Sequence, residues 1–236
     1  MNEPRRAQLE RNLGLVRQRI EMAAKAAGRS STEITLIVVT KYFPASDVEI
    51  LAQLGVQDVG ENKHQEAQAK AEQCSGLPIR WHYIGGMQSN KAAQIARYVD
   101  AVHSVDRLKL LPRLDLGASG RDDLLDVLIQ VNLDPPRQAD SSRQGVGSQE
   151  VITLAKAISE TAHLRLRGVM GIAPLDLDPE PAFTQLARVS AQLRNEFPEA
   201  TWISAGMSAD LESAIAAGAT HVRVGSGILG QRPHMK

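Results

Sequence analysis

The sequence is short of the residues that mark several classes of protein. Its 236 residues contain one cysteine, Cys74, which excludes an internal disulfide framework and indicates a reducing compartment. Basic and acidic residues number 27 each, so no overall field attracts nucleic acid or an anionic membrane. No apolar run approaches the roughly 20 residues of a membrane span, and the first residues lack the apolar core of a signal peptide. We therefore expect a cytoplasmic protein that captures any anion through a local site.

Metal-ligand patterns are also lacking. The six histidines lie far apart in the sequence and show no paired ligand spacing: His64, His82, His103, His163, His221 and His234. We expect no metal site, and we interpret these residues as surface or packed histidines.

The chain instead repeats one type of unit, a short apolar strand followed by a helical segment. Eight segments read as strands: 35–40, 56–62, 81–86, 101–105, 126–133, 166–172, 201–206 and 221–226. Most are apolar beyond simple alternation, as in strands covered on both faces. The alternation leaves a closed (β/α)8 TIM barrel or an open doubly wound sheet, and the count of eight favours the barrel. We predict one α/β barrel domain over residues 1–236.

Helix signals fall between the strands. Ser46, Ser148 and Ser208 are candidate N-caps, and Gly55 and Gly218 are candidate helix ends. An additional helix is predicted before the first strand, where apolar residues recur every three or four positions: Leu9, Leu13, Val16, Ile20, Ala23 and Ala27. This helix could plug the bottom of the barrel or pack beside it, and the sequence does not choose between the two.

Polar residues follow the predicted strands at their carboxyl ends, where such barrels carry their active sites. Lys41 follows the first strand, and Gly225 and Ser226 follow the eighth. Barrel closure makes these strands neighbours, so we expect Lys41 close to the glycine–serine turn. Residues 225–230 match the pattern GxGxxG. A dinucleotide site is not expected, because the sequence ends at Lys236, before the further helix, strand and acidic residue that such a site needs.

We interpret this turn as a phosphate site. Glycines let backbone N–H groups approach an anion, and a short helix that begins there adds its positive end. The hydroxyls of Ser204, Ser208 and Ser226 are expected near the same corner, so a phosphate monoester fits. The alternative is that the glycines only turn the chain.

Lys41 ends an apolar strand with an amine. A lysine in this position commonly extends its head to water. Burial among barrel side chains disfavours the ammonium, however, and a neutral amine can form a Schiff base with an aldehyde. Beside a phosphate site, this chemistry indicates pyridoxal 5'-phosphate (PLP). Arg223 would then face the pyridine nitrogen, a place commonly taken by Asp or Arg, and would keep that nitrogen unprotonated and weaken the ring as an electron sink.

Several segments together resemble one family. VVTK, VGENKHQE, WHYIGGMQSNK, LRGVMGI, ISAGMSADLESAI and HVRVGSGILG, spread over nearly the whole chain, are similar to the pyridoxal phosphate homeostasis proteins of the YggS type. The resemblance implies a barrel like the N-terminal domain of alanine racemase, with Lys41 as the Schiff-base lysine. It also implies that Asn62 contacts the cofactor ring, Arg223 the ring nitrogen, and Ser208, Gly225 and Ser226 the phosphate. Lys63 stands where the family usually has tyrosine.

The loop after the fifth strand, residues 134–147, is rich in Pro, Ser and Gly and is expected to be mobile. Family members often carry a lysine before its glycine. Arg143 keeps a positive charge there, which could attract an anion or simply be solvated.

Three functions compete. An amino-acid racemase needs a second base opposite the lysine; in racemases a separate domain supplies a tyrosine, and this sequence offers Tyr42, Tyr83 and Tyr98, which we interpret as packing residues. A carrier would hold PLP, buffer it and pass it to apo forms of PLP-dependent enzymes, without robust turnover and with no catalytic residues. An aldolase-type barrel would use the Lys41 amine on a phosphorylated sugar. The missing second base and Arg223 favour the carrier, which we expect to be a monomer.

Overall fold

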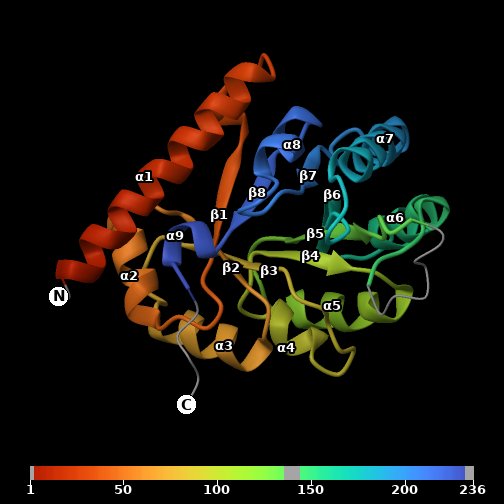
Figure 1. The fold of residues 1–236 in the computed structure, drawn as a ribbon. Helices are drawn as coiled ribbons and strands as arrows, with labels where there is room; N and C mark the ends of the chain where they lie inside the picture. Colours follow the sequence, from red (N-terminus) through yellow and green to blue (C-terminus); the bar gives the residue numbers. More distant parts are fainter. Residues whose placement is uncertain (1–2, 136–143, 232–236) are drawn as a thin grey trace.

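The strands close into a barrel in chain order. The computed structural model describes residues 3–135 and 144–231, and in it eight parallel strands pair from β1 through β8, with β8 returning to β1 (Figure 1). Val38 of β1 is aligned with Val59 of β2 on one side and with Val224 of β8 on the other. Pairing on both sides of β1 excludes the open sheet and confirms the predicted barrel.

Each predicted strand is present, with ends that differ by a few residues. The strands are β1 (Thr35–Val39), β2 (Asp58–Glu61), β3 (Arg80–Tyr83), β4 (Ala101–Val105), β5 (Leu125–Val131), β6 (Leu164–Gly171), β7 (Trp202–Ser204) and β8 (His221–Val224). All of β4 and β8 is buried, because helices cover the outside of the barrel and side chains fill the inside. This two-sided burial explains the continuous apolar runs in the sequence.

Helices follow the strands and form an outer layer (Figure 1). They are α1 (Glu3–Ala26), α2 (Ala45–Gln53), α3 (His64–Gln73), α4 (Ala92–Ala96), α5 (Leu111–Ala118), α6 (Val151–Ser159), α7 (Glu180–Glu196), α8 (Leu211–Ala216) and α9 (Ser226–Leu229). Short 3-10 turns precede some elements: η1 (Ser31–Glu33), η2 (Leu108–Leu110) and η4 (Ser148–Glu150). Within residues 3–135 and 144–231, no helix combines the length and the apolar character that crossing a membrane requires.

The three predicted serine caps are wrong. Ser46 lies inside α2, because Pro44 already occupies the N-cap position and the helix begins two residues earlier than predicted. Ser148 begins the 3-10 turn that leads into α6, so it lies before the helix proper. The N-cap of α8 is Asp210, and the Ser208 hydroxyl is therefore left for other contacts. Local serine patterns failed here because the preceding loops set where each helix starts.

The two predicted glycine ends are confirmed. Gly55 follows α2 with φ +78°, and Gly218 follows α8 with φ +101°. Residues with a side chain rarely adopt this left-handed conformation, which glycine reaches without steric cost.

Helix α1 packs beside the barrel, which settles the placement that the sequence left open. It lies against α2, α8 and α9 on the outside of the barrel (Figure 1). Its buried side is lined by Leu9, Leu13, Val16, Ile20 and Ala24. The Asn12 amide donates to the carbonyl of Ile228 at 2.9 Å, and the Arg5 guanidinium donates to the carbonyl of Leu229 at 3.1 Å. Helix α1 therefore holds α9, which begins at the predicted phosphate turn.

The buried side of α1 can be tested with two leucines on the same helix. Leu13 is 2% exposed and Leu15 is 57% exposed. Truncation at the buried position leaves a cavity, so we expect Leu13→Ala to lower the free energy of unfolding by about 2–4 kcal/mol. The matched control Leu15→Ala should change it by less than about 0.5 kcal/mol. Urea unfolding of both variants measures the difference, and equal losses would mean that α1 does not belong to the folded core.

Candidate functional site

A pocket of about 420 Å³ opens at the carboxyl ends of the strands. Six of the seven predicted site residues line it: Lys41, Asn62, Ser208, Arg223, Gly225 and Ser226. They come from segments that follow or end β1, β2, β7 and β8, so barrel closure brings the two ends of the sequence to one place. Ser204, the seventh residue, is fully buried and does not line the pocket.

Lys41 and the phosphate turn lie side by side. A Cβ atom on Gly225 would stand 3.2 Å from the carbonyl oxygen of Val39, tighter than ordinary contact. A glycine at this position therefore lets the turn after β8 pack directly on the end of β1. The half-buried Lys41 follows two residues later and shares the pocket with Gly225 and Ser226.

A buried charge cluster fixes the backbone on both sides of Lys41. Lys70 Nζ donates to the carbonyl of Thr40, to Glu61 Oε1 and to Glu66 Oε1, each at 2.7 Å. The Thr40 hydroxyl donates to Glu61 Oε1 at 2.6 Å, and the backbone N–H of Tyr42 donates to Glu66 Oε1. Tyr42 has φ 71°, a strained conformation for a residue with a side chain. The cluster thus holds the turn that presents Lys41.

The same cluster perturbs one of its carboxyls. Burial raises the pKa of Glu61, and the nearby Lys70 ammonium opposes that rise. Glu61 Oε2 is buried and finds no hydrogen-bond partner among the described residues. Removal of Lys70 would therefore leave buried carboxyl groups without their cation.

Asn62 lines the pocket and carries an unpaired polar atom. Its Oδ1 is buried without a hydrogen-bond partner in the described part of the chain, which is a costly state for an amide oxygen. A Cβ atom on Gly85 would stand 2.2 Å from the Asn62 carbonyl oxygen, so this glycine allows the close approach of the two segments.

Arg223 is buried at 4% exposure and keeps a charged guanidinium. Burial lowers its pKa to about 10, which leaves it protonated at neutral pH. Nη1 donates to Ser204 Oγ at 2.7 Å and Nη2 donates to the carbonyl of Gly171 at 2.9 Å. The expected place of the Ser204 hydroxyl at the phosphate corner therefore differs from the structure. Ser204 ends β7 pointing into the barrel, where it accepts from Arg223.

Two hydroxyls meet at the phosphate turn. Ser226 Oγ lies 3.4 Å from Ser208 Oγ, and Ser208 Oγ accepts from the backbone N–H of Gly227 at 3.3 Å. The hydroxyl that failed to cap α8 thus faces the turn. Because α9 has only four residues, the hydroxyls and the open glycine backbone, rather than a helix dipole, are the groups here that could contact an anion.

A buried histidine chain lies behind Ser204, and the sequence reasoning missed it. His103 Nδ1 lies 2.8 Å from Ser204 Oγ, His103 Nε2 lies 2.9 Å from His82 Nδ1, and His82 Nε2 lies 2.8 Å from Asp58 Oδ1. Burial lowers the pKa of His103 well below its ordinary value. Each histidine is the third residue of its strand, in β3 and β4, and this shared parity is the one sequence feature that could have indicated a common inward direction.

Four of the six histidines are buried in the described structure. His64, His82, His103 and His221 are buried, as expected for packed histidines, while His163 is half-buried and His234 lies outside the described residues. Over residues 3–135 and 144–231, no group of three or more His, Cys, Asp or Glu side chains could hold a metal ion.

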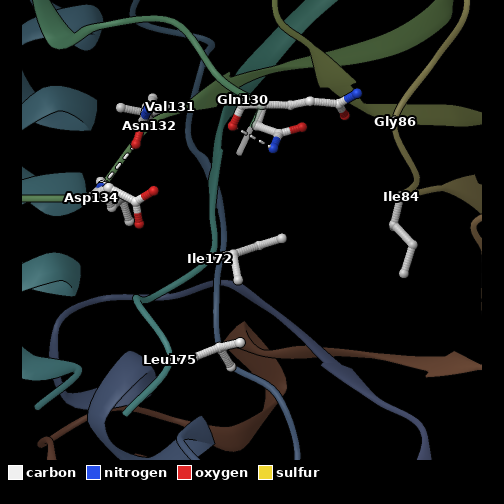
Figure 2. Close-up of a pocket in the computed structure, with 10 residues that line it drawn as sticks. Ile84, Gly86, Gln130, Val131, Asn132, Asp134, Ile172 and Leu175 are labelled. Carbon is white, nitrogen blue, oxygen red and sulfur yellow. Dashed lines mark hydrogen bonds between the residues drawn. The ribbon is translucent and has the colours of Figure 1, made fainter. Parts of the chain in front are cut away.

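A second pocket of about 360 Å³ adjoins the first, and Ile84 and Ile172 line both. Figure 2 shows Asn132 and Asp134 on one side of it and Ile84 on the other. Asn132 Oδ1 accepts from the backbone N–H of Asp134 at 2.8 Å, so this amide is used by its own loop. Most of the loop expected at 134–147, including Arg143, lies outside the described residues.

The Lys70 cluster can be tested by removing its cation. Lys70→Met leaves Glu61 and Glu66 without an ammonium, so we expect the free energy of unfolding to fall by about 3–5 kcal/mol. Lys25→Met, at an exposed position of α1, is the control and should change it by less than about 0.5 kcal/mol. Denaturant unfolding at pH 7 measures both variants. A loss at Lys70 no larger than at Lys25 would contradict a stabilising role for the cluster.

Comparison with known proteins places the chain in a family. Residues 8–233 match the model of the alanine racemase N-terminal domain. The chain is 41% identical over 247 residues to a pyridoxal phosphate homeostasis protein of Mycobacterium tuberculosis (97% of this chain, 94% of the relative) and 38% identical over 231 residues to one of Escherichia coli K12 (95% and 97%).

Solved structures agree with the sequence matches. The structure of PipY from Synechococcus elongatus with PLP bound superposes with a TM-score of 0.81 at 31% identity, covering 94% of this chain and 100% of PipY. Alanine racemase of Corynebacterium glutamicum shares the fold at 16% identity, with a TM-score of 0.67 over 98% of this chain and 63% of the racemase. The chain therefore belongs to the pyridoxal phosphate homeostasis protein family.

Proposed function

We propose that this chain binds PLP and serves PLP homeostasis by buffering and delivering the cofactor. The observation that carries the proposal is the meeting of three chemically different groups in one pocket: the Lys41 amine, the buried Arg223 guanidinium and the serine–glycine turn at Ser226. These groups complement an aldehyde, a pyridine nitrogen and a phosphate in turn. The names of the homologues and the PLP bound to PipY support the same cofactor.

The proposed roles follow from the chemistry of each side chain. Lys41 holds the cofactor as a Schiff base through its amine. Asn62, which lines the same pocket, contacts the cofactor ring. Arg223 faces the ring nitrogen. Ser208, Gly225 and Ser226 bind the phosphate, and Ser204 acts from beneath through its hydrogen bond to Arg223.

The proposed carrier has no robust turnover of its own. PLP supplies an electron-withdrawing ring, and a guanidinium that stays charged and donates to the ring nitrogen weakens that effect. Tyr83 and Tyr98 are poor second bases because burial raises the pKa of each phenol. The hydroxyl of Tyr83 donates to the carbonyl of Asn62 at 3.3 Å, and that of Tyr98 donates to the carbonyl of His64 at 3.3 Å. Both phenols are therefore used in packing.

We also propose the recipients of the cofactor, the oligomeric state and the compartment of the protein. Its recipients are apo forms of PLP-dependent enzymes, and it acts as a monomer in the cytoplasm. The balanced net charge and the single cysteine, Cys74, support this setting. The Cys74 thiol is buried and its pKa is raised by burial, which makes it an inert thiol.

Spectroscopy of the purified protein tests the Schiff base. With added PLP, the wild type should show an imine band near the violet that borohydride bleaches, and mass spectrometry should locate the reduced label on Lys41. Lys41→Ala should lose the band. Lys63→Ala is the matched control and should keep the band. Both ammonium groups lie near the Tyr42 ring, with Lys63 Nζ 5.0 Å and Lys41 Nζ 6.0 Å from its centre. A band of equal strength in Lys41→Ala would overturn the proposal.

Racemisation assays separate the carrier from an enzyme. The loaded wild type, mixed with L-alanine or L-serine, should convert them far more slowly than the 1–10³ s⁻¹ turnover typical of enzymes. Chiral chromatography of the amino acids measures the rate. Turnover within that range would support the racemase instead. An aldolase-type barrel would show neither racemisation nor a visible band on addition of PLP.

A further inference from the structure

One continuous hydrogen-bond chain crosses the barrel interior beneath the pocket. It begins at Arg223 on β8, passes through Ser204 on β7, His103 on β4 and His82 on β3, and ends at Asp58, the first residue of β2. Its successive heavy-atom distances are 2.7, 2.8, 2.9 and 2.8 Å. All five residues are at most 5% exposed, so water is largely excluded from these bonds.

The two ends of the chain fix its direction. A guanidinium only donates hydrogen bonds and an ionised carboxylate only accepts them. The pKa of Asp58 is lowered despite burial, through its contacts with His82 and Arg80, so this end is a carboxylate at neutral pH. His82 must therefore donate from Nε2 to Asp58, which leaves Nδ1 of a neutral ring as an acceptor.

The remaining links follow from that assignment. His103 donates from Nε2 to His82 Nδ1, so its own Nδ1 accepts the hydroxyl proton of Ser204. The oxygen of Ser204 then accepts from Arg223 Nη1. Each of the four links then has one donor and one acceptor, with both histidines neutral and protonated on Nε2.

The opposite direction costs more. It would need a charged His82 and a proton on His103 Nδ1, with Ser204 accepting from both neighbours and its own hydroxyl proton left without a partner. A buried unpaired hydroxyl is unfavourable. An imidazolium would also place a second positive charge in the same interior as Arg223, and the lowered pKa of His103 is consistent with a neutral ring.

Arg223 depends on this chain for its orientation. In the described part of the molecule no ion pair involves its guanidinium, which is held by the Ser204 hydroxyl and the Gly171 carbonyl. Two of its five N–H donors are used there, and the residue lines the pocket. A long side chain fixed at two points loses less freedom when a ligand binds, because that entropy cost is already met in the folded state.

We propose that four positioning residues hold the Arg223 guanidinium toward the cofactor pocket: Ser204, His103, His82 and Asp58. They act through a hydrogen-bond chain with one fixed assignment of donor and acceptor at each link. This rests on the proposed function where it concerns the cofactor. The chain itself is a property of the protein without ligand, so the two parts can fail separately.

The direction is tested on the cofactor-free full-length wild type. Long-range ¹H–¹⁵N NMR spectra at pH 7 distinguish the two histidine tautomers and the charged form. We expect both His82 and His103 as neutral rings protonated on Nε2. A proton on His103 Nδ1, or a charged ring at either position, would overturn the proposal. No variant is needed, so this measurement does not depend on whether a mutant folds.

The positioning role is tested with a matched pair of serines. Ser204→Ala removes the acceptor of Arg223, and Ser104→Ala removes a buried β4 hydroxyl that has no hydrogen-bond partner among the described residues. Loss of a bond to a charged donor should weaken PLP binding about tenfold in Ser204→Ala and little in Ser104→Ala. Titration of the imine band gives the Kd, and the histidine spectra of each variant confirm folding.

The outcomes distinguish the two proposals. An unchanged Kd in a folded Ser204→Ala variant would overturn the positioning role and leave PLP binding intact. A tenfold weaker Kd in both variants would overturn it as well, because a general loss of packing would explain the result. If the wild type takes up no PLP, the proposed function fails and the positioning role toward the cofactor fails with it, whatever the tautomers are.

Discussion

The pairing of β1 with β8 is the interaction on which the site depends. Without it, Lys41 and Arg223 would be ends of two strands at opposite edges of an open sheet. With Ile37 aligned to Arg223 and Val38 to Val224, the segments after both strands reach one pocket. The glycine at position 225 lets the turn after β8 pack on the last residue of β1. Helix α1 supports the same seam from outside through its bonds to the carbonyls of Ile228 and Leu229. Fold closure and site formation are therefore one event.

The barrel accommodates two buried cations in different ways. Lys70 is surrounded by Glu61 and Glu66 and by a backbone carbonyl, so its three N–H donors are all used. It is a structural charge that fixes the turn carrying Lys41. Arg223 is held by one hydroxyl and one carbonyl, both uncharged, and lines the pocket. Among the described residues no ion pair engages this guanidinium, so an electron-rich acceptor such as a pyridine nitrogen suits it. Lys70 is therefore a structural cation, whereas Arg223 is the cation that lines the pocket.

The sequence predicts the barrel well because its strands are buried on both faces, and continuous apolar runs such as the one before Lys41 result directly from that burial. Strand ends then indicate Lys41 and Ser226, since one rule of barrel geometry places both at the same face. Helix starts were predicted poorly: Pro44 moves the start of α2, and a 3-10 turn precedes α6. The chain from Arg223 to Asp58 joins residues from five strands. No local pattern encodes such a set, because each link depends on the distance between side chains that only the closed barrel brings together.

Exposure at the pocket bears on the choice between carrier and enzyme. An enzyme that stabilises a carbanion gains from excluding water, whereas a carrier must release its cofactor, and hydrolysis of an imine consumes water. In the described structure Lys41 is half-buried and Ser226 is exposed, so solvent reaches both the amine and the phosphate turn. Arg223, which lines the same pocket, is buried, and so is Ser204, which accepts its hydrogen bond. Under the proposed function, a buried guanidinium and a solvent-accessible lysine and serine turn in one pocket suit a cofactor that is bound and later released.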